Sequence, residues 1–374
     1  MLSKFTVSNF KNFKEPFIFS LEDARNYNFN ASAVKEGVVQ NAIVYGYNGV
    51  GKSNLGLALF DIVGHLTDKH TDAENSYGES SYLNAYNKTR AATFKYEFLF
   101  GRQRVIYSYE KKSFRLLLKE QLIINDQIVA EIDRSQGTIA RIELAGAESL
   151  NKELNNPNLS LLKYIQTNAN LIDSLENRIL AEFFDFVNKM LFYRSLSRNL
   201  YLGYENGVWD IETDIIKKGK LKDFELFLNE KANLDCRLEA VSTFDKIIIA
   251  FDFDGVHIPF YDIASTGTQA LALFYAWSLR LRSEQPVSFL FIDEFDAFYH
   301  HELSRAIVEL LKESEVQFVL TTHNTSIMTN DLLRPDCYFL MWPNKIQSLA
   351  ASTAKELREA HNIEKMYKAG AFYE

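Results

Sequence analysis

Residues 46–53 read Gly46-Tyr47-Asn48-Gly49-Val50-Gly51-Lys52-Ser53 and match the pattern G-x-x-x-x-G-K-[ST]. The loop follows a short apolar run, Ala42 to Tyr45, and precedes a segment, Ser53 to Leu66, whose apolar residues have helical spacing. A glycine-rich turn with a chance lysine is the alternative, but the order of strand, loop and helix favours a phosphate-binding loop.

Each part of this loop has a role in holding a nucleoside triphosphate. Glycines allow consecutive backbone N–H groups to point at one anion, and the start of the following helix adds a favourable field. Lys52 can reach the β- and γ-phosphates, and the Ser53 hydroxyl can ligate Mg²⁺. The predicted cofactors are therefore ATP and Mg²⁺. The predicted nucleotide-binding residues here are Gly46, Asn48, Gly49, Val50, Gly51, Lys52, Ser53 and Asn54.

A second motif, Phe289-Leu290-Phe291-Ile292-Asp293-Glu294, places two carboxylates at the end of an apolar run typical of a buried strand. Asp293 is predicted to coordinate Mg²⁺ with Ser53, directly or through water. Glu294 is predicted to polarise the water that attacks the γ-phosphate, which makes it a candidate catalytic residue beside Lys52. Buried strands also end in acidic residues that only start a loop or cap a helix, but the phosphate-binding loop favours catalysis.

The chain between the two motifs is far longer than one crossover connection requires, because 241 positions separate Lys52 from Asp293. Residues 93–144 alternate with period two and predict antiparallel strands, whereas 150–235, including Leu171 to Phe192, has helical spacing and predicts a mainly helical insert. The predicted domains are an N-terminal ATPase lobe (1–149), the helical insertion (150–235), a C-terminal ATPase lobe (236–345) and a C-terminal tail (346–374).

This layout resembles the heads of ABC-type ATPases. Within that superfamily the chain is similar to the SMC and RecF-like branch, and to small bacterial AAA-family ATP-binding proteins found beside phage-defence effectors. It looks like an overcoming-lysogenisation-defect head without a nuclease domain. Val7 to Phe13 resembles the opening strand of these heads, and His361 to Tyr367 resembles the tail of defence-associated members. The resemblance implies an α/β P-loop NTPase fold with a mixed sheet, an antiparallel β subdomain and an inserted helical lobe.

The segment Ser265-Thr266-Gly267-Thr268-Gln269, just before the apolar stretch Ala270 to Leu281, is similar to the signature motif of that superfamily. Such a motif binds the γ-phosphate held by the opposite subunit, so Ser265, Gly267 and Gln269 become candidate nucleotide contacts. A hydroxyl, a close-approaching N–H and a helix N-terminus suit an anion. The segment departs from the usual pattern, with threonines where leucine, serine and glycine are common. A helix N-cap is the alternative.

Thr321-Thr322-His323, at the end of the apolar run Val316 to Leu320, resembles the switch histidine motif. In that family the histidine touches the γ-phosphate, so the resemblance adds His323 to the candidate catalytic residues. Its position 30 residues after Asp293 agrees with this role. A single histidine at a strand end is otherwise usually a hydrogen-bonded polar residue without a catalytic role.

The overall composition restricts the class of protein. The chain has 374 residues, 47% of them hydrophobic, and a net charge of −8, which argues against a protein that coats nucleic acid. Its two cysteines fit no metal-ligand spacing, and no apolar stretch approaches the roughly 20 residues that span a bilayer. We therefore expect a cytoplasmic protein with no membrane partner. The one basic cluster, Lys217 to Lys222, favours a solvated face over contact with DNA or RNA.

The leading functional hypothesis is an ATP-hydrolysing switch whose two heads associate around ATP, as a homodimer or a higher homo-oligomer. Only 51 residues follow His323, too few for the nuclease domain that ends some relatives, so we expect an effector in trans, a nuclease or a toxin, in anti-phage defence. The alternative from another class is a RecF- or SMC-like repair ATPase that clamps DNA, with a basic channel formed on dimerisation. A third hypothesis is a scaffold with a structural nucleotide, and a transporter motor fits less well because the insert is long.

Overall fold

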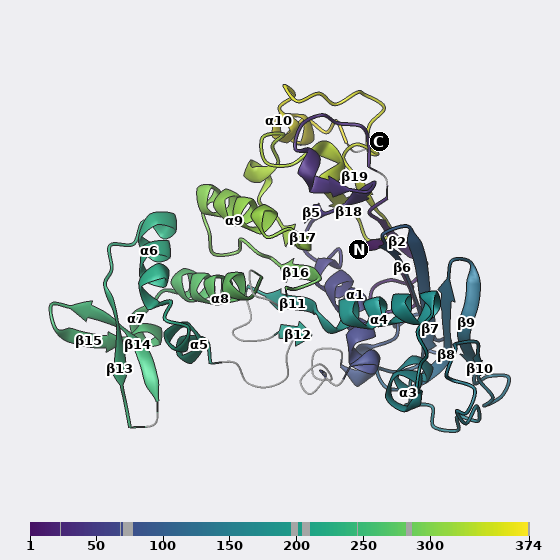
Figure 1. Cartoon of the computed structure of the whole chain (residues 1–374). Helices are drawn as coiled ribbons and strands as arrows, with labels where there is room; N and C mark the ends of the chain where they lie inside the picture. Colours follow the sequence, from purple (N-terminus) through teal and green to yellow (C-terminus); the bar gives the residue numbers. More distant parts are fainter. Residues whose placement is uncertain are drawn as a thin grey trace.

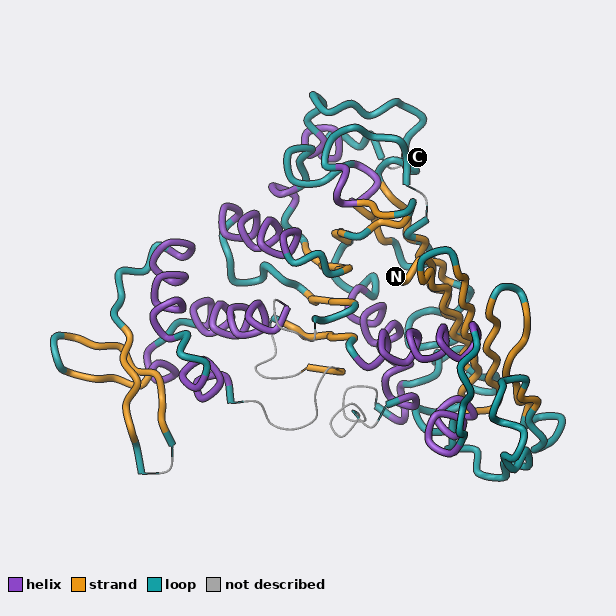
Figure 2. The backbone as a smooth tube through the Cα atoms, in the orientation of Figure 1, coloured by secondary structure: helices purple, strands orange, loops and turns teal. Residues whose placement is uncertain are grey.

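The computed structural model describes residues 1–22, 24–67, 69, 78–195, 201–203, 210–244, 246–281 and 286–372. These residues form two seven-stranded sheets, one three-stranded sheet and one two-stranded sheet. The strands gather in three places, with the antiparallel sheet at one end, a mixed sheet, called the central sheet below, in the middle and the three-stranded sheet at the other end (Figures 1 and 2). The segment Thr67 to Arg90 is polar, and its composition predicts an exposed connection; residues 68 and 70–77 lie outside the described residues, and the described part includes a short 3-10 turn, Glu79–Ser81.

The first sheet is antiparallel throughout, in the order β10-β9-β8-β7-β6-β1-β2. Burial alternates along its strands, as the period-two pattern requires for a sheet with one face on the core. The antiparallel strands predicted for 93–144 are therefore confirmed. Their bounds are β1 (Leu2–Ser8), β2 (Phe17–Ser20), β6 (Ala92–Phe100), β7 (Gln103–Lys111), β8 (Leu117–Ile124), β9 (Gln127–Asp133) and β10 (Arg141–Ile142).

The second sheet is mixed, in the order β12-β11-β16-β17-β5-β18-β19. Its five central strands are parallel, and an antiparallel strand closes each edge. Strands β5, β16 and β17 are buried along their whole length, because helices and the first sheet cover both faces. Their bounds are β5 (Asn41–Tyr45), β11 (Met190–Arg194), β12 (Tyr201–Gly203), β16 (Phe289–Asp293), β17 (Gln317–Thr322), β18 (Tyr338–Met341) and β19 (Ile346–Ser348). The predicted α/β head fold with a mixed sheet and an antiparallel subdomain is present.

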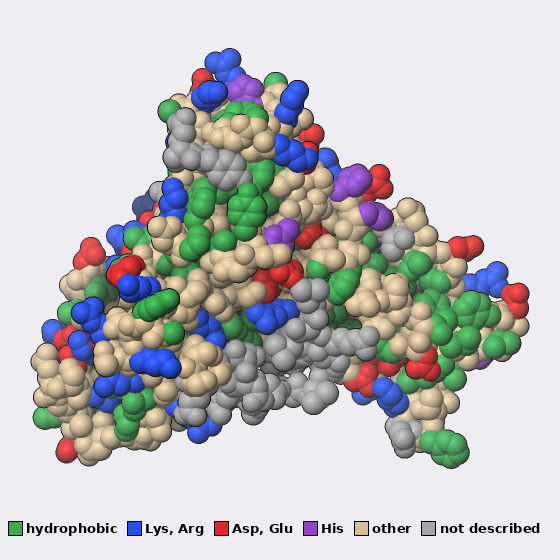
Figure 3. Space-filling view, turned by 180° about the vertical axis from the view of Figure 1, so that it is seen from behind, with side chains coloured by type: hydrophobic (Ala, Val, Ile, Leu, Met, Phe, Trp, Pro, Cys, Tyr) green, Lys and Arg blue, Asp and Glu red, His purple; other side chains and the backbone are tan. Residues whose placement is uncertain are grey.

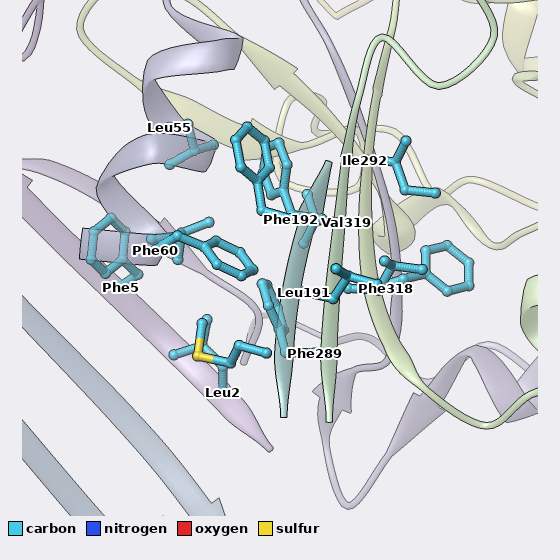
Figure 4. Packing of buried hydrophobic residues seen from close by; sticks show 14 of the residues in the cluster. Leu2, Phe5, Leu55, Phe60, Leu191, Phe192, Phe289, Ile292, Phe318 and Val319 are labelled. Atoms are coloured by element: carbon cyan, nitrogen blue, oxygen red, sulfur yellow. The ribbon is translucent and has the colours of Figure 1, made fainter. Parts of the chain in front are cut away.

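Helix α1 (Lys52–Leu66) packs between the two large sheets. Figure 4 shows Leu55 and Phe60 of α1 with strand β1 on one side and the central strands on the other. The ring of Phe60 lies 5.5 Å from that of Phe192 and 6.1 Å from that of Phe289, measured between centroids. The helix that starts at the phosphate-binding loop is therefore held by both large sheets.

The range predicted as a helical insert, 150–235, contains two strands of the central sheet, β11 and β12. Helices α3 (Leu161–Asn168), α4 (Leu175–Asn188), α5 (Ile211–Lys217) and α6 (Leu221–Ala232) agree with the predicted spacing. The helix expected to continue to Phe192 ends at Asn188, however, and β11 follows it into the sheet beside β16. The apolar run Met190 to Tyr193 has no polar alternation because it is buried on both faces, so its pattern does not distinguish strand from helix.

The third sheet projects from the centre with α5, α6 and α7 (Phe260–Ile263). It consists of β13 (Leu238–Ser242), β14 (Ile247–Phe253) and β15 (Val256–Pro259). Asp254 and Gly255, an Asp-Gly pair that is typical of hairpin turns, form the turn between β14 and β15, with φ of 54° and 95°. Hydrophobic side chains gather on the surface of this lobe (Figure 3). The exposed large ones are Leu226, Phe244, Ile247, Phe253, Val256 and Ile263.

Helix α8 (Thr266–Leu281) runs from this lobe towards the central sheet, α9 (His301–Glu313) connects β16 to β17, and α10 (Ile363–Lys368) lies near the end of the chain. Two short strands, β3 (Val34–Lys35) and β4 (Val38–Val39), precede the loop strand β5. Among the residues that the structure describes, no helix has the length and apolarity needed to cross a membrane.

Candidate nucleotide-binding site

The carboxyl ends of β5, β17, β16 and β11 meet at one edge of the central sheet. The register pairs Thr322 with Tyr45 and Asp293 with Arg194, so the loops that follow these strands begin side by side. Ligands of open α/β sheets bind at this edge, where loops and helix N-termini converge. Parallel pairing thus brings together motifs that are 241 positions apart in the sequence.

The backbone conformation and close packing of the phosphate-binding loop require glycine at several positions. Gly49 and Gly51 have φ of 82° and 108°, conformations that side chains rarely adopt. A Cβ on Gly51 would lie 2.4 Å from Nδ2 of Asn12, and one on Gly46 would lie 2.8 Å from the carbonyl oxygen of Met341. The loop conformation therefore depends on glycine at these positions.

Lys52 is the first residue of α1, and its side chain folds back over the loop. Its Nζ donates to the carbonyl oxygens of Gly46 at 2.8 Å and Tyr47 at 3.3 Å. Nζ also lies 2.9 Å from Nε2 of His323, at the end of β17. Because an ammonium group can only donate, Nε2 is the acceptor of this hydrogen bond. The two predicted γ-phosphate contacts are thus in direct contact with each other.

Burial and the neighbouring charges shift the pKa values of this pair. Burial lowers the pKa of Lys52, while the carboxylates of Glu294 and Asp293 oppose that shift. Burial and the charge of Lys52 lower the pKa of His323 below its ordinary value of 6.5, with Glu294 and Asp293 again acting in the other direction. A neutral imidazole at pH 7 agrees with the acceptor role of Nε2.

The predicted magnesium ligands, Ser53 and Asp293, are in contact. Ser53 Oγ donates to Asp293 Oδ2 at 2.6 Å, and Thr321 Oγ1 donates to Asp293 Oδ1 at 2.8 Å. A hydroxyl and a carboxylate are hard oxygen donors, and Mg²⁺ sites in nucleotide-binding proteins use few protein ligands together with the phosphates. The residues present therefore fit the ion. Within the described ranges, no group of three or more His, Cys, Asp or Glu side chains suits a metal bound by protein alone.

Glu294 follows the strand in a left-handed backbone conformation, with φ of 51°. Its N–H donates to Thr321 Oγ1 at 2.8 Å, and its Oε1 lies 3.8 Å from Nε2 of His323. Thr321 therefore holds both acidic residues, since its hydroxyl accepts from the backbone N–H of Glu294 and donates to the carboxylate of Asp293. This positioning role was not predicted, although the residue lies in the histidine motif.

Two asparagines tie the segment after β1 to the loop and to α1. Asn12 Nδ2 donates to the carbonyl oxygen of Val50 at 3.2 Å, and Asn54 Nδ2 donates to Asn12 Oδ1 at 2.7 Å. Val50 is buried, whereas Asn48 is exposed at the tip of the loop. The role of Asn12 was missed because only the tertiary fold brings the segment after β1 to the loop.

The segment Ser265 to Gln269 forms the start of α8. Ser265 Oγ accepts from the N–H of Thr268 at 3.1 Å, which is an N-cap, and the Gln269 amide donates to the carbonyl oxygen of Ala264 at 2.9 Å. Ser265 itself is exposed, and Gly267 is half-buried against Phe298. In the part of the chain that the structure describes, no hydrogen bond joins this segment to residues 46–54. The structure thus brings together Lys52, Ser53, Asp293, Glu294 and His323, but not Ser265, Gly267 and Gln269.

One further charged group at this edge was not predicted. Arg194, the last residue of β11, places Nε 3.2 Å from Oδ2 of Asp293. A cavity of about 420 Å³ also adjoins the loop, between Tyr47, His323 and the residues Tyr367 and Lys368 of α10. A larger groove, of about 1040 Å³, lies on the first sheet away from the motifs.

Comparisons with solved structures find SMC heads. An SMC head bound to the C-winged helix domain of ScpA has 16% sequence identity and a TM-score of 0.44, covering 93% of this chain and 97% of that one. The SMC head domain from Thermotoga maritima has 15% identity, a TM-score of 0.41 and coverage of 93% and 98%. An SMC head from Pyrococcus furiosus, with an extended coiled coil and bound to the C-terminal domain of ScpA, has 14% identity, a TM-score of 0.40 and coverage of 93% and 96%.

No curated protein matches the sequence. A family model matches residues 42–329, which include the phosphate-binding loop, both carboxylates and His323. The match covers more than half of the chain, and the protein therefore belongs to the P-loop ATPase family described as "AAA domain, putative AbiEii toxin, Type IV TA system".

Proposed function

We propose that this protein is an ATP-hydrolysing switch whose heads associate around ATP and so control a separate effector protein in bacterial anti-phage defence. The observation that carries the hydrolytic part is the convergence of Lys52, Ser53, Asp293, Glu294 and His323. Their side chains come from α1 and from the ends of two neighbouring parallel strands, β16 and β17, and they contact one another at 2.6 to 3.8 Å. The set contains each group that phosphoryl transfer to water requires.

The chain's own residues divide the work of hydrolysis. Mg²⁺ held by Ser53 and Asp293 supplies neutralisation of the phosphate charge. Lys52 transfers its hydrogen bonds from the loop carbonyls to the phosphate oxygens. Glu294 lies at the end of β16, where its carboxylate orients the attacking water and accepts its proton. His323 lies between Lys52 and Glu294, so it joins the phosphate-binding side of the site to the water-activating side.

The position of Ser265 supports association of two heads. It caps the N-terminus of a 16-residue helix and is exposed, and its hydrogen bonds remain within its own turn. A helix N-terminus with an exposed hydroxyl favours an anion. We infer that this anion is the γ-phosphate bound to a second copy, which makes the catalytic site a composite of two chains.

The description of the matched family supports the defence context, because it names a toxin of a toxin–antitoxin system. The charge distribution gives less support to a DNA clamp. Lys218, Lys220 and Lys222 of the basic cluster are paired with Asp214, Asp223 and Glu225, as expected for a solvated face.

A Glu294→Gln variant tests the catalytic assignment. We expect its phosphate release to fall by about 100-fold or more while ATP still binds, because the base is lost and the phosphate contacts remain. The same variant should form a stable dimer with ATP in size-exclusion chromatography with light scattering, and should copurify with its effector. Glu309→Gln, at an exposed ion pair on α9, is the matched control. Unchanged turnover in Glu294→Gln would refute the assignment, and ATP-dependent, salt-sensitive DNA retention would favour the clamp.

Complementation tests the composite site. Lys52→Ala and Ser265→Ala proteins should each be inactive alone, because every site in either homodimer lacks one contribution. A mixed dimer contains one intact site, so equal mixing should restore about a quarter of the wild-type activity. Mixtures that stay inactive although mixed dimers form would contradict the composite site.

A further inference from the structure

Strand β11 brings an arginine to the edge of the nucleotide site, and we propose that Arg194 competes with Mg²⁺ for Asp293. When ATP binds, the guanidinium leaves Asp293 and binds the phosphates instead. Asp293 is then free to bind Mg²⁺, so metal binding depends on nucleotide binding. This inference rests on the proposed function, because it concerns the same site. It assigns a coupling role to a residue outside the phosphate-binding loop and the other motifs of the site.

Sheet register fixes the position of Arg194. Met190 to Arg194 pair in parallel with Phe289 to Asp293, residue by residue, so Arg194 lies directly beside Asp293 at the end of the strands. The distance from Arg194 Nε to Asp293 Oδ2 is 3.2 Å. The same Oδ2 atom accepts from Ser53 Oγ at 2.6 Å. The guanidinium therefore lies next to the two oxygen atoms that fit Mg²⁺.

The burial of Asp293 makes this cation necessary. The Asp293 side chain is only 4% exposed, and a buried carboxylate without a compensating cation is strongly destabilising. Ser53 and Thr321 supply hydroxyl donors but no charge. Arg194 supplies the positive charge in direct contact with Asp293. A divalent ion on the same carboxylate would stand within a few ångströms of the guanidinium, and the two would repel each other.

The hydrogen bonding of Arg194 indicates a second acceptor. Its Nε atom is buried, yet among the described residues no acceptor forms a hydrogen bond with it, because the approach to Asp293 lacks the required geometry. Arginine presents a fork of N–H groups that matches phosphate oxygens. The side chain as a whole is 31% exposed, so it has room to turn towards the loop. Phosphate oxygens would satisfy the donor that Asp293 leaves unpaired.

A purely structural role for Arg194 makes a different prediction. If the arginine only joined β11 to β16, its removal would lower stability without changing the order in which metal and nucleotide bind. Competition between Arg194 and the metal ion for Asp293 instead predicts that removal of the guanidinium changes the metal affinity and the nucleotide affinity in opposite directions. Metal alone should bind better without the guanidinium, and nucleotide without metal should bind worse.

The test compares wild-type protein with Arg194→Met, which removes the charge and adds no metal ligand. Mn²⁺ binding without nucleotide is measured by electron paramagnetic resonance, and a fluorescent ATP analogue is titrated in excess EDTA. We expect Arg194→Met to bind Mn²⁺ about tenfold more tightly and the analogue in EDTA about tenfold more weakly, changes typical of one close charge pair. Arg178→Met, at an exposed ion pair on α4, is the control and should change neither affinity.

Arg194→Lys keeps the test decisive if the methionine variant does not fold. A lysine retains the charge but loses the fork, so Mn²⁺ affinity should remain at the wild-type level while the analogue binds a few-fold more weakly in EDTA. If wild-type protein binds the analogue with Mg²⁺ but both folded variants keep the wild-type affinities, the inference about Arg194 is refuted and the proposed function is not. Wild-type protein that binds no analogue at all would refute the proposed function itself.

Discussion

Lys111→Met is expected to lower the free energy of unfolding by about 3 kcal/mol, because it leaves a buried carboxylate without its cation. Lys111 Nζ donates to Asp61 Oδ1 at 2.7 Å, and neither side chain is exposed. Burial lowers the pKa of Lys111, and the Asp61 carboxylate opposes that shift. Methionine has a similar length and no charge, so the core stays filled and the loss is mainly electrostatic.

The magnitude follows from what Asp61 retains. Breaking a buried ion pair by removing one partner typically costs about 3–5 kcal/mol. Asp61 keeps hydrogen bonds from the hydroxyls of Tyr82 at 2.8 Å and Tyr109 at 2.9 Å, which places the expected loss at the lower end of that range. Since Asp61 lies on α1 and Lys111 on β7, the loss reports how firmly the antiparallel sheet holds the helix of the phosphate-binding loop.

Equilibrium unfolding in urea, followed by circular dichroism, measures the effect. Lys189→Met, at a partly exposed pair with Asp185 at the end of α4, is the matched control and should lose no more than about 0.5 kcal/mol. The double variant Asp61→Asn with Lys111→Met removes both charges and should recover at least about half of the loss. Equal small losses in the Lys111 and Lys189 variants, or a double variant less stable than Lys111→Met, would refute the reasoning.

Three other perturbations have defined outcomes. Gly51→Ala should weaken ATP binding about tenfold or more in a fluorescence titration, because φ is 108° there and the new Cβ would lie 2.4 Å from Asn12 Nδ2; unchanged affinity would contradict this. Thr321→Val should lower the rate of phosphate release about tenfold with ATP affinity retained, because the Asp293 carboxylate and the Glu294 backbone lose the hydroxyl that holds them; loss of binding alone would argue against positioning. Burial lowers the pKa of His65 well below 6.5, so the unfolded state binds the extra proton and stability is lost as pH falls below about 6.5, by up to about 1.4 kcal/mol per unit. His65→Gln should flatten that slope in urea unfolding at pH 7, 6 and 5, and parallel slopes would exclude His65 as its source.

The sequence was most informative where chemistry demands particular residues at fixed spacing. The phosphate-binding loop, the carboxylates after β16 and the histidine after β17 were recognisable because each follows a short apolar run. Sheet order then places them together, as parallel strands that end at one edge must do. Period two likewise identified the antiparallel sheet, since one of its faces is solvated.

The residues that were missed act through tertiary register rather than through local pattern. Asn12 reaches the loop from the segment after β1 of the first sheet, and Thr321 acts through a hydroxyl that any strand-end threonine carries. The role of Arg194 was harder to predict, because the apolar residues Met190 to Tyr193 follow those of α4 and show no alternation that would mark a separate strand. A strand buried on both faces cannot be assigned by alternation, so the partner of Asp293 became visible only when β11 was placed beside β16.

Binding at this site exchanges hydrogen bonds rather than simply adding them. Lys52 donates to two loop carbonyls, and Ser53 donates to Asp293, so phosphate and Mg²⁺ must replace bonds that the protein makes internally. The net affinity is then a difference between comparable terms. The groups that exchange these bonds also contact the ends of other strands. Lys52 contacts His323 after β17, and Asp293 at the end of β16 contacts Arg194 at the end of β11. Nucleotide binding therefore changes the contacts of three adjacent strand ends at once, which is the property that a switch requires of its ligand site.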